Sequence, residues 1–325
     1  MRVLVTGATG FLGSHITEQL LRAGDVVTAT RREESDLRWI PLEEVQLVEY
    51  SAGESSNLRY VLPDIDAVIH CAAITRARRR NEFYRVNARG TLDLLELCAD
   101  YAPDLKRFVF ISSQAASCPA CEGNPVRETS PEEPISAYGT SKLIAERTVR
   151  EFSRVFPTTI IRPPSVYGPR DRDIFQFFKL VKRGVMPSLG DPERRFSAIY
   201  VKDLARAISM ALRADNSGGR TYFVTDGKPH SWREFGAAIA EALDVNPLNL
   251  KVPEFAAKSA AALAEAASIL TRKAPLLSLD KVREISDNWV CSDELIRREL
   301  GYSAEYDLES GIRETAEWYK KEGWL

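Results

Sequence analysis

Short apolar runs alternate with amphipathic segments along the first two thirds of the chain. The runs that we predict to be strands are residues 3–5, 26–30, 45–48, 67–70, 108–111, 158–161 and 222–224. The first amphipathic segment between them, residues 14–22, predicts a helix. This alternation predicts βαβ crossovers and a parallel sheet buried on both faces. The fold class is therefore α/β, with ligands expected beyond the carboxyl ends of the strands.

The pattern changes at two places further along the chain. Residues 173–195 interrupt it with an apolar stripe at Ile174, Phe177, Phe178 and Val181, and the chain is mainly helical from residue 231 onward. We expect a sheet domain of residues 1–164 and 196–228, covered on the substrate side by a smaller lobe of residues 165–195 and 229–325. Residues 255–270 are rich in alanine, which predicts a packed helix; a helix lying on a membrane or on a partner is the alternative.

The first thirteen residues, MRVLVTGATGFLG, lead an apolar strand directly into Gly7, Gly10 and Gly13. A backbone that turns sharply, admits a diphosphate and packs a helix tightly on a strand needs residues without Cβ at these positions. The N–H groups and the dipole of the following helix then hold phosphates. The pattern favours a dinucleotide as ligand, although glycine turns between strand and helix also occur in α/β proteins without one.

The end of the second strand indicates which dinucleotide is preferred. Arg31 and Arg32 follow the run of residues 26–30. Binders of NAD(H) usually place an acidic residue here to accept a hydrogen bond from the ribose 2′-OH, whereas arginine accommodates a 2′-phosphate. NADP(H) is therefore the preferred cofactor. NAD(H) stays possible if the arginines are solvated and Glu33 or Glu34 reaches the ribose.

The composition excludes several other classes of protein. Of the 325 residues, 44% are apolar and 28% are charged, and the formal charge is −2, so neither nucleic acid nor an anionic membrane attracts the chain as a whole. No apolar stretch of about 18 residues lacks charges, so no membrane span is expected. The chain enters its first strand without a leader pattern, so we expect a cytoplasmic location.

The five cysteines are an odd number and indicate reduced thiols. Cys118 and Cys121 form a single CxxC, which in another context would hold zinc or cycle as a dithiol. Zinc needs two more ligands, and the chain has no second CxxC and no paired histidines. We therefore expect no metal.

A candidate for proton transfer follows the strand of residues 108–111. That strand leads into FISSQAAS, and Tyr138 and Lys142 come 25 and 29 residues after Ser113. Positions four apart share one face of a helix, so the phenol and the ammonium point into the same cleft. A free tyrosine has a pKa of about 10, and a neighbouring cation is the natural way to lower it. With a serine hydroxyl to bind the reacting oxygen, these groups form a site for hydride exchange at carbon.

The chain resembles an extended short-chain dehydrogenase/reductase of the NAD-dependent epimerase/dehydratase superfamily. The motifs that carry the resemblance, in family order, are TGATGFLG, IHCAA, VNARGT, SSQAAS, YGTSK, RPPSVYGP and FSAIYVKDLARAI. They extend from residue 2 to residue 208. The resemblance implies a Rossmann-type doubly wound parallel sheet with a smaller, mainly helical C-terminal lobe.

The resemblance also implies roles for single residues. Tyr138 corresponds to the general acid/base, Lys142 to its activator and nicotinamide-ribose ligand, and Ser113 to the hydroxyl partner. Ser112 takes that place if the alignment shifts by one residue. Asn87 corresponds to the family's catalytic asparagine, although a purely structural hydrogen bond fits it equally well.

Further residues correspond to family positions that contact the cofactor or the substrate. Those expected at the cofactor are Gly7, Thr9, Gly10, Phe11, Leu12, Gly13, Arg31, Arg32, Cys71, Ala72, Ala73, Tyr138, Lys142, Pro163, Ser165 and Val166. Those expected at the substrate are Gln114, Ser165 and Tyr167.

Two positions depart from the pattern of many relatives. The third strand of those relatives ends in an acidic residue that meets the adenine, and Ser51 stands at the matching place here. Nucleotide-sugar enzymes often read RxFNVYG, whereas this chain reads RPPSVYG with Ser165. The C-terminal segments PLLSLDKVREISDNWVCSDELIRRELGY and WYKKEGWL resemble the dihydroflavonol-reductase and 3β-hydroxysteroid-dehydrogenase branch.

These observations predict an enzyme that moves hydride reversibly between NADP(H) and a ketone or secondary alcohol on a small, rather apolar molecule. One alternative is a nucleotide-sugar epimerase or dehydratase that holds NAD tightly. Another is a non-catalytic dinucleotide sensor, which would have no need of Ser113, Tyr138 and Lys142.

Two surface features leave alternatives open. Five arginines lie near the expected substrate entrance and form either a solvated face or a clamp for phosphate or carboxylate: Arg76, Arg78, Arg79, Arg80 and Arg85. Relatives commonly dimerise through two helices, so we expect a homodimer. The apolar residues on the matching helices serve either the core or that interface: Leu92, Leu95, Cys98, Leu143, Ala145 and Val149.

Overall fold

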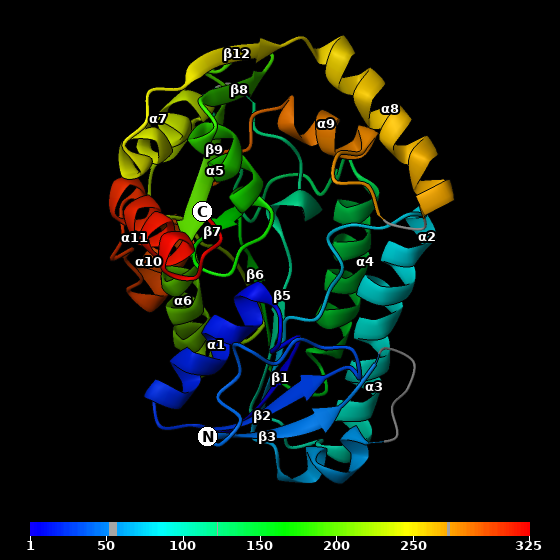
Figure 1. Cartoon of the computed structure of the whole chain (residues 1–325). Coiled ribbons are helices and arrows are strands. Elements are labelled where there is room, and N and C mark those ends of the chain that lie inside the picture. Colours follow the sequence, from blue (N-terminus) through cyan, green and yellow to red (C-terminus); the bar gives the residue numbers. More distant parts are fainter. Residues whose placement is uncertain (52–56, 122, 272–273) are drawn as a thin grey trace.

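A parallel sheet forms the centre of the computed structural model, which describes residues 1–51, 57–121, 123–271 and 274–325 (Figure 1). Within these residues the sheet has seven strands in the order β10-β6-β5-β4-β1-β2-β3, and every neighbouring pair is parallel. The strands are β1 (Arg2–Thr6), β2 (Val26–Arg31), β3 (Val45–Glu49), β4 (Ala67–His70), β5 (Arg107–Ile111), β6 (Thr158–Arg162) and β10 (Arg220–Phe223). The α/β fold class is confirmed.

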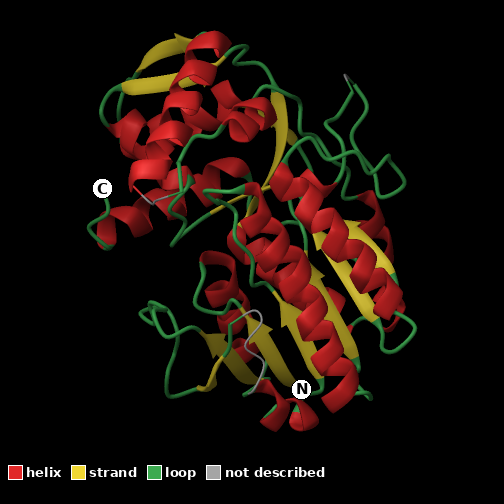
Figure 2. Cartoon of the chain, turned by 90° about the vertical axis from the view of Figure 1, so that its right-hand side faces the viewer, coloured by secondary structure: helices red, strands yellow, loops and turns green. Residues whose placement is uncertain are grey.

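Helices cover both faces of the sheet (Figures 1 and 2). On one face, α1 (Phe11–Arg22) and α6 (Val201–Arg213) share an apolar core with the strands, to which they contribute Ile16, Leu20, Leu204 and Ile208. On the other face, α3 (Gly90–Tyr101) and α4 (Ala137–Phe152) cover a second core. The chain continues from β1 to β2 on one side of β1 and later from β4 on the other side, so the strand order reverses beside β1. In open α/β sheets, ligands bind at the carboxyl ends of the strands where the order reverses.

The residues proposed for a dimer interface include several that belong to this second core. Leu95 and Cys98 on α3, and Ala145 and Val149 on α4, are fully buried against the sheet. Their apolar character is therefore explained within one copy of the chain.

A smaller lobe lies above the carboxyl ends of the strands (Figures 1 and 2). It contains a three-stranded sheet in the order β11-β9-β7 and the parallel pair β12-β8. Its strands are β7 (Ser165–Tyr167), β8 (Val185–Leu189), β9 (Arg195–Tyr200), β11 (Pro229–Ser231) and β12 (Leu248–Val252). Its helices are α5 (Ile174–Lys182), α7 (Trp232–Leu243), α8 (Glu254–Thr271), α9 (Leu279–Ile285) and α11 (Leu308–Lys321). The short α2 (Arg80–Phe83) lies at the edge below α8.

The boundary between the two parts passes through elements that serve both. Strand β9 gives Ile199 to the core of the main sheet and Tyr200 to the core of the lobe. Helix α10 (Glu294–Leu300) lies in a range expected to belong to the lobe, yet Ile296 and the following Tyr302 are buried in the core of the main sheet. Their apolar side chains complete the sheet core beside β10.

Candidate active site

The glycine loop between β1 and α1 has little room for side chains. Gly7 has a φ of 69°, and a Cβ there would lie 2.7 Å from the Ala72 backbone nitrogen. A Cβ on Gly13 would lie 2.1 Å from the Gly7 carbonyl oxygen, because the first turn of α1 packs directly on the loop. Gly10 caps α1 without a side chain and donates its own N–H to Gly7 at 3.0 Å. No side chain in the described part of the protein caps the free N–H groups of the first turn, and such groups suit a phosphate.

The rest of this loop and the neighbouring segment after β4 are small or only half-buried. Thr9, Phe11 and Leu12 are half-buried along the loop. The Ala72 N–H donates to the Thr6 hydroxyl at 3.3 Å, and Ala73 is exposed. Burial raises the pKa of the Cys71 thiol to about 12, which keeps it protonated and unreactive.

The end of β2 presents two arginines. Arg31 is the last residue of the strand and lies 3.6 Å from the Glu49 carboxylate, while Arg32 lies 3.4 Å from Glu34. Both ion pairs are exposed enough to break when a stronger anion approaches. Ser51 is half-buried two residues beyond the end of β3, and residues 52–56 lie outside the described part of the chain.

Tyr138 stands at the start of α4, where the packing of backbone on backbone brings it to Ser113. Ser136 caps the helix by accepting the Gly139 N–H at 3.1 Å. A Cβ on Gly139 would lie 2.0 Å from the Ala115 carbonyl oxygen, so the first turn of α4 rests on the turn that contains Ser113. Burial raises the pKa of Tyr138 to about 12; a hydrogen bond with Ser113 opposes the rise and the charge of Glu284 adds to it.

The two adjacent serines have different partners. Ser112 donates to the Glu146 carboxylate at 2.5 Å, beneath the site, where Glu146 also accepts from Arg162 at 2.6 and 2.9 Å. Ser113 accepts the Ala115 N–H at 3.2 Å and forms a hydrogen bond with the Tyr138 phenol. Ser113 is therefore the serine that lies beside Tyr138.

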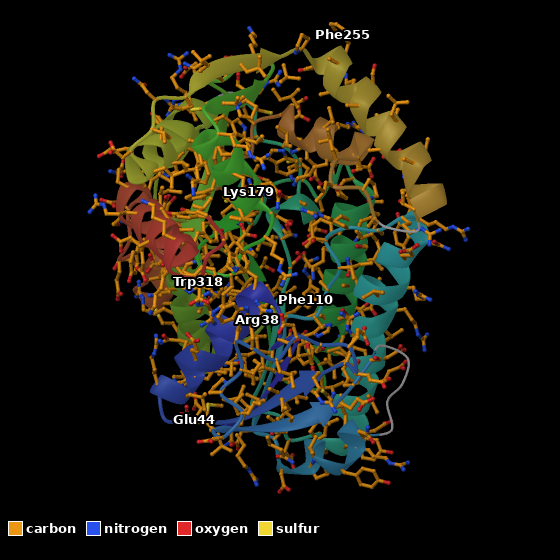
Figure 3. The ribbon with its side chains drawn as sticks, viewed as in Figure 1. Arg38, Glu44, Phe110, Lys179, Phe255 and Trp318 are labelled. Carbon is orange, nitrogen blue, oxygen red and sulfur yellow. The ribbon has the colours of Figure 1, made fainter. Side chains whose placement is uncertain are left out.

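Lys142 lies one helical turn after Tyr138 and is buried. Its ammonium donates to the Ile111 carbonyl at 2.6 Å and lies 4.1 Å from the centre of the Phe110 ring, which Figure 3 labels near the middle of the molecule. Burial lowers its pKa to about 8, and the groups of Cys71 and Glu146 oppose that shift. At neutral pH the ammonium form therefore persists one helical turn from Tyr138.

Asn87 lies in a π-helical turn (Tyr84–Arg89) that leads into α3, and its side chain makes structural hydrogen bonds. It accepts the Ile74 N–H at 2.9 Å, donates to the Ile74 carbonyl at 3.0 Å, and donates to the Ser141 hydroxyl at 3.0 Å. Asn87 therefore holds the segment after β4 against α4. In this arrangement all three of its hydrogen bonds join these two segments.

A buried hydrogen-bond relay behind this site has no obvious sequence signal. The Thr91 hydroxyl donates to the Asn87 carbonyl at 2.6 Å, so it accepts from His70 Nε2 at 3.0 Å; His70 Nδ1 then accepts from the Thr6 hydroxyl at 2.6 Å. Burial lowers the pKa of His70 to about 3 and keeps the ring neutral, as this relay requires. The relay joins β1, β4 and the turn before α3.

The remaining predicted residues are either half-buried or part of the core. The Pro163 carbonyl accepts the Gln114 N–H at 2.9 Å, and Ser165 and Val166 are half-buried on β7. Gln114 is buried, and its side-chain nitrogen has no partner among the described residues. Tyr167 does not match its expected role at the substrate, because its ring is buried in the lobe core against Tyr200 and Phe235. Side chains alternate along β7, so Tyr167 points to the face opposite that of Val166.

Sequence reasoning did not anticipate that α9 reaches the catalytic helix. Asp280 accepts the Ala137 N–H at the start of α4 at 3.0 Å and also accepts from Arg80 at 3.0 Å. Glu284, on the same helix, is near enough to Tyr138 to affect its pKa. A carboxylate at the start of a helix is favourable because it meets free N–H groups and the positive end of the dipole.

The arginine cluster is partly paired. Arg76 forms an ion pair with Asp173, and Arg80 with Asp280. Arg78, Arg79 and Arg85 are exposed and have no ion pair within the described ranges.

Three other features were singled out from the sequence. Cys118 and Cys121 are free thiols, half-buried and exposed respectively. Among the described residues no group of three His, Cys, Asp or Glu side chains is arranged for a metal. The described helices include none with the length and apolar character needed to cross a bilayer.

This fold and these residues define the class of short-chain dehydrogenases/reductases. The model of the NAD dependent epimerase/dehydratase family matches residues 3–224, and the chain belongs to that family. It is accordingly an NAD(P)-dependent enzyme of the oxidoreductase type, in a family that also includes epimerases and dehydratases.

Similar proteins cover nearly the whole chain. Ceramide reductase of Caulobacter vibrioides is 29% identical over 99% of this chain and 96% of its own. The 4-hydroxy-2-methyl-3-oxo-4-farnesyl-3,4-dihydroquinoline-1-oxide ketoreductase of Stigmatella aurantiaca is 27% identical over 96% of this chain and 95% of its own. The structure of Thermus thermophilus UDP-glucose 4-epimerase in complex with NAD has a TM-score of 0.79 and 26% identity, covering 98% of this chain and 99% of that one.

Proposed function

We propose that the protein is an NADP(H)-dependent ketoreductase that acts on a ketone or secondary alcohol carried by an apolar, lipid-like skeleton. The observation that carries the proposal is the approach of Ser113, Tyr138 and Lys142 at the carboxyl ends of β5 and β6, beside the glycine loop. The role of each of these three residues follows from its surroundings.

The residues present fit a dinucleotide. The lack of a Cβ at Gly7 and Gly13 lets the loop pack directly on the segment after β4 and on the first turn of α1, and α1 begins with unsatisfied N–H groups and no acidic residue in its first turn. A diphosphate satisfies those donors and the positive end of the helix dipole. When bound, the nicotinamide supplies the hydride that is exchanged with carbon.

The protein's own contribution is to hold the reacting oxygen and to move one proton. Because the pKa of Tyr138 is about 12, its phenol stays protonated at neutral pH and is ready to donate to a ketone oxygen. Ser113 donates a hydrogen bond to the same oxygen. Lys142, still an ammonium below about pH 8, stabilises the phenolate that the donation leaves.

The choice of substrate class has two supports. Two relatives that span almost the full chain are named for ceramide and for a farnesylated quinoline oxide, and both names describe reductases. Ser165 stands where nucleotide-sugar enzymes often have asparagine. The alternative is an epimerase or dehydratase, supported by the fold match to the NAD complex of the Thermus enzyme.

The choice of cofactor depends on Arg31 and Arg32. A 2′-phosphate competes for their guanidinium groups with Glu49 and Glu34, whose exposed ion pairs contribute little. We expect NADPH to bind at least tenfold more tightly than NADH, and R31A/R32A to remove that difference by weakening NADPH alone. Fluorescence titration of both cofactors measures this; equal affinities in the unchanged chain would contradict the preference.

Turnover is tested with Tyr138→Phe. We expect the variant to bind NADPH normally and to reduce a panel of long-chain ketones slower by at least a thousandfold, because only the transferred proton is lost. Tightly held NAD that copurifies and does not exchange would favour the epimerase. Tight cofactor binding without turnover of any ketone or nucleotide sugar would favour a sensor.

We further propose that the protein works in the cytoplasm as a homodimer. The five cysteines are free thiols, in line with a reducing compartment, and Ile144 on the outer face of α4 is exposed and available to a second copy. Light scattering of the purified chain measures its oligomeric state.

A further inference from the structure

Helix α8 is unusual because its outward face is as apolar as its inward face. The inward face packs on α9, where Ala257 and Ala261 meet Val282 in a small core separate from that of the lobe. The outward face carries Phe255, which is 74% exposed, and Leu263, which is 72% exposed. A helix that is apolar all round is normally covered on every side by protein or lipid.

The described part of α8 carries few charges, and each of them has a partner. Glu254 lies 2.9 Å from Arg194, which joins the start of the helix to the loop before β9. Glu265 accepts the Leu279 N–H at 2.8 Å and so is turned toward α9. Between residues 254 and 268 the one remaining charged side chain is Lys258, whose ammonium lies 3.7 Å from Glu254.

The apolar surface continues beyond the helix. The connection from α8 to α9 adds Leu276, which is 63% exposed, and the first residue of α9 adds Leu279, which is 42% exposed. Figure 3 labels Phe255 at the outer end of α8, far from the sheet, and Figure 1 shows the other end of the helix beside α2. Surface leucines that occur singly need no explanation, but a group of this size marks a contact surface.

Positive charge lies at the α2 end of this surface. Arg80 of α2 pairs with Asp280 of α9, which places the arginine cluster next to the helix on which α8 packs. Arg78, Arg79 and Arg85 stand exposed there without an ion pair in the described part of the chain. Apolar side chains beside unpaired arginines are the pattern of a helix that lies in the interface of an anionic bilayer.

We propose that this surface, formed by Phe255, Leu263, Leu276, Leu279 and the arginines Arg78, Arg79 and Arg85, docks on the surface of an anionic lipid bilayer. The apolar side chains enter the region between headgroups and acyl chains, and the arginines meet lipid phosphates. Because α9 carries Asp280 and Glu284 to the start of α4, docking would bring the start of α4, where Tyr138 lies, near the bilayer. The proposal rests on the proposed function only for its purpose, the delivery of a lipid-like ketone.

The test is flotation of the full chain with vesicles, in the absence of any substrate. We expect binding to vesicles of equimolar phosphatidylglycerol and phosphatidylcholine, weaker binding to phosphatidylcholine alone, and release by salt. F255D/L263D should lower the affinity at least tenfold. R78Q/R79Q/R85Q should lower it on the order of a hundredfold, since each arginine near an anionic surface contributes about fivefold.

A matched control is Leu42→Asp, which places the same charge on an exposed leucine in the connection before β3. It should bind vesicles like the unchanged chain, and all variants should keep their thermal unfolding and their NADPH affinity. Absence of binding to either vesicle, or equal binding by every variant, would overturn the proposal. So would conversion of a dimer to a monomer by F255D/L263D, because the face would then cover a second copy. Turnover of a short, water-soluble ketone should be unchanged in the variants, so the docking surface and the proposed function can fail separately.

Discussion

Ser112 and Ser113 show how one position along the chain separates a structural role from a catalytic one. Side chains of an extended segment alternate in direction, so Ser112 reaches down to Glu146 and Ser113 faces Tyr138. We expect Ser113→Ala to lower kcat by roughly a hundredfold through loss of the hydrogen bond to the reacting oxygen. Ser112→Ala should keep kcat and lower the free energy of unfolding by about 1–2 kcal/mol, because Glu146 loses a charge-assisted partner.

The measurements are steady-state kinetics and urea unfolding of both variants. If Ser112→Ala loses turnover while Ser113→Ala keeps it, the assignment of the two serines is reversed.

Lys142 combines a catalytic advantage with a cost to stability. Its pKa falls from 10.5 to about 8 on burial, so the folded chain holds this proton less tightly than the unfolded chain. Protonated Lys142 therefore destabilises the fold at neutral pH, and the cost declines as the pH rises from about 8 towards 10.5. We expect Lys142→Met to abolish turnover yet raise the free energy of unfolding by up to about 3 kcal/mol at pH 7 and about 1 kcal/mol at pH 10.

Urea unfolding of both chains at the two pH values checks this expectation. A gain in stability that is the same at pH 7 and pH 10 would show that better packing of methionine, and not the buried charge, is responsible.

At this scale the sequence predicted residue types better than residue partners. The spacing of Tyr138 and Lys142 was sufficient to place both on one face of α4. It did not show which of Ser112 and Ser113 faces Tyr138, because the two residues are identical and the direction of each side chain depends on the register of the strand. Nor did it indicate that His70 belongs to a relay, since Thr6 and Thr91 lie 64 and 21 residues away in sequence.

Among the elements, the glycine loop contains one glycine that the packing of the fold requires and another that ligand binding is expected to require. A Cβ on Gly13 would overlap the Gly7 carbonyl, whereas a Cβ on Gly10 would lie 3.3 Å from it, a contact that a small shift relieves. We expect Gly13→Ala to lower the free energy of unfolding by about 1–3 kcal/mol. Gly10→Ala should leave stability nearly unchanged but weaken cofactor binding at least tenfold, because its methyl group stands where a diphosphate approaches.

Thermal unfolding and cofactor titration of the two variants give the comparison. Gly10→Ala with unchanged cofactor affinity would contradict the assignment of this loop to the diphosphate.

The strands of the main sheet were predictable and those of the lobe were not. The run of residues 67–70 coincides with β4, because a short run of fully buried residues, three of them apolar, is typical of a central parallel strand. The strands β7 and β11 have three residues each, too few to show a period. The family resemblance placed Tyr167 at the substrate, and no period in this short strand indicated that its ring lies in the lobe core.

At the scale of the whole molecule, the hydrogen bond from the Ala137 N–H to Asp280 joins segments that lie 143 residues apart. Asp280 on α9 holds the start of α4 and Arg80 together, and no local pattern in the sequence connects these three places. The alternation of strands and helices was sufficient to predict the parallel sheet, because each strand and the helix that follows it are close together in the sequence. The closure of the lobe over the site depends on contacts between distant segments, which a single sequence does not display.

This contact leads to a prediction about substrate binding. We expect Asp280→Ala to raise KM for a long-chain ketone by about tenfold, with kcat within twofold and an unchanged Kd for NADPH, since about 1.4 kcal/mol of hydrogen bonding would be lost between α9 and α4. Hydrogen exchange should become faster in residues 137–140 and 279–285. Lys281→Ala is the matched control, because Lys281 is exposed on the same helix and pairs only with Glu284, at 3.2 Å, within the described part of the chain. If both variants raise KM equally, the charge balance of α9 and not its attachment to α4 governs substrate binding; if neither does, the lobe closes over the site without this contact.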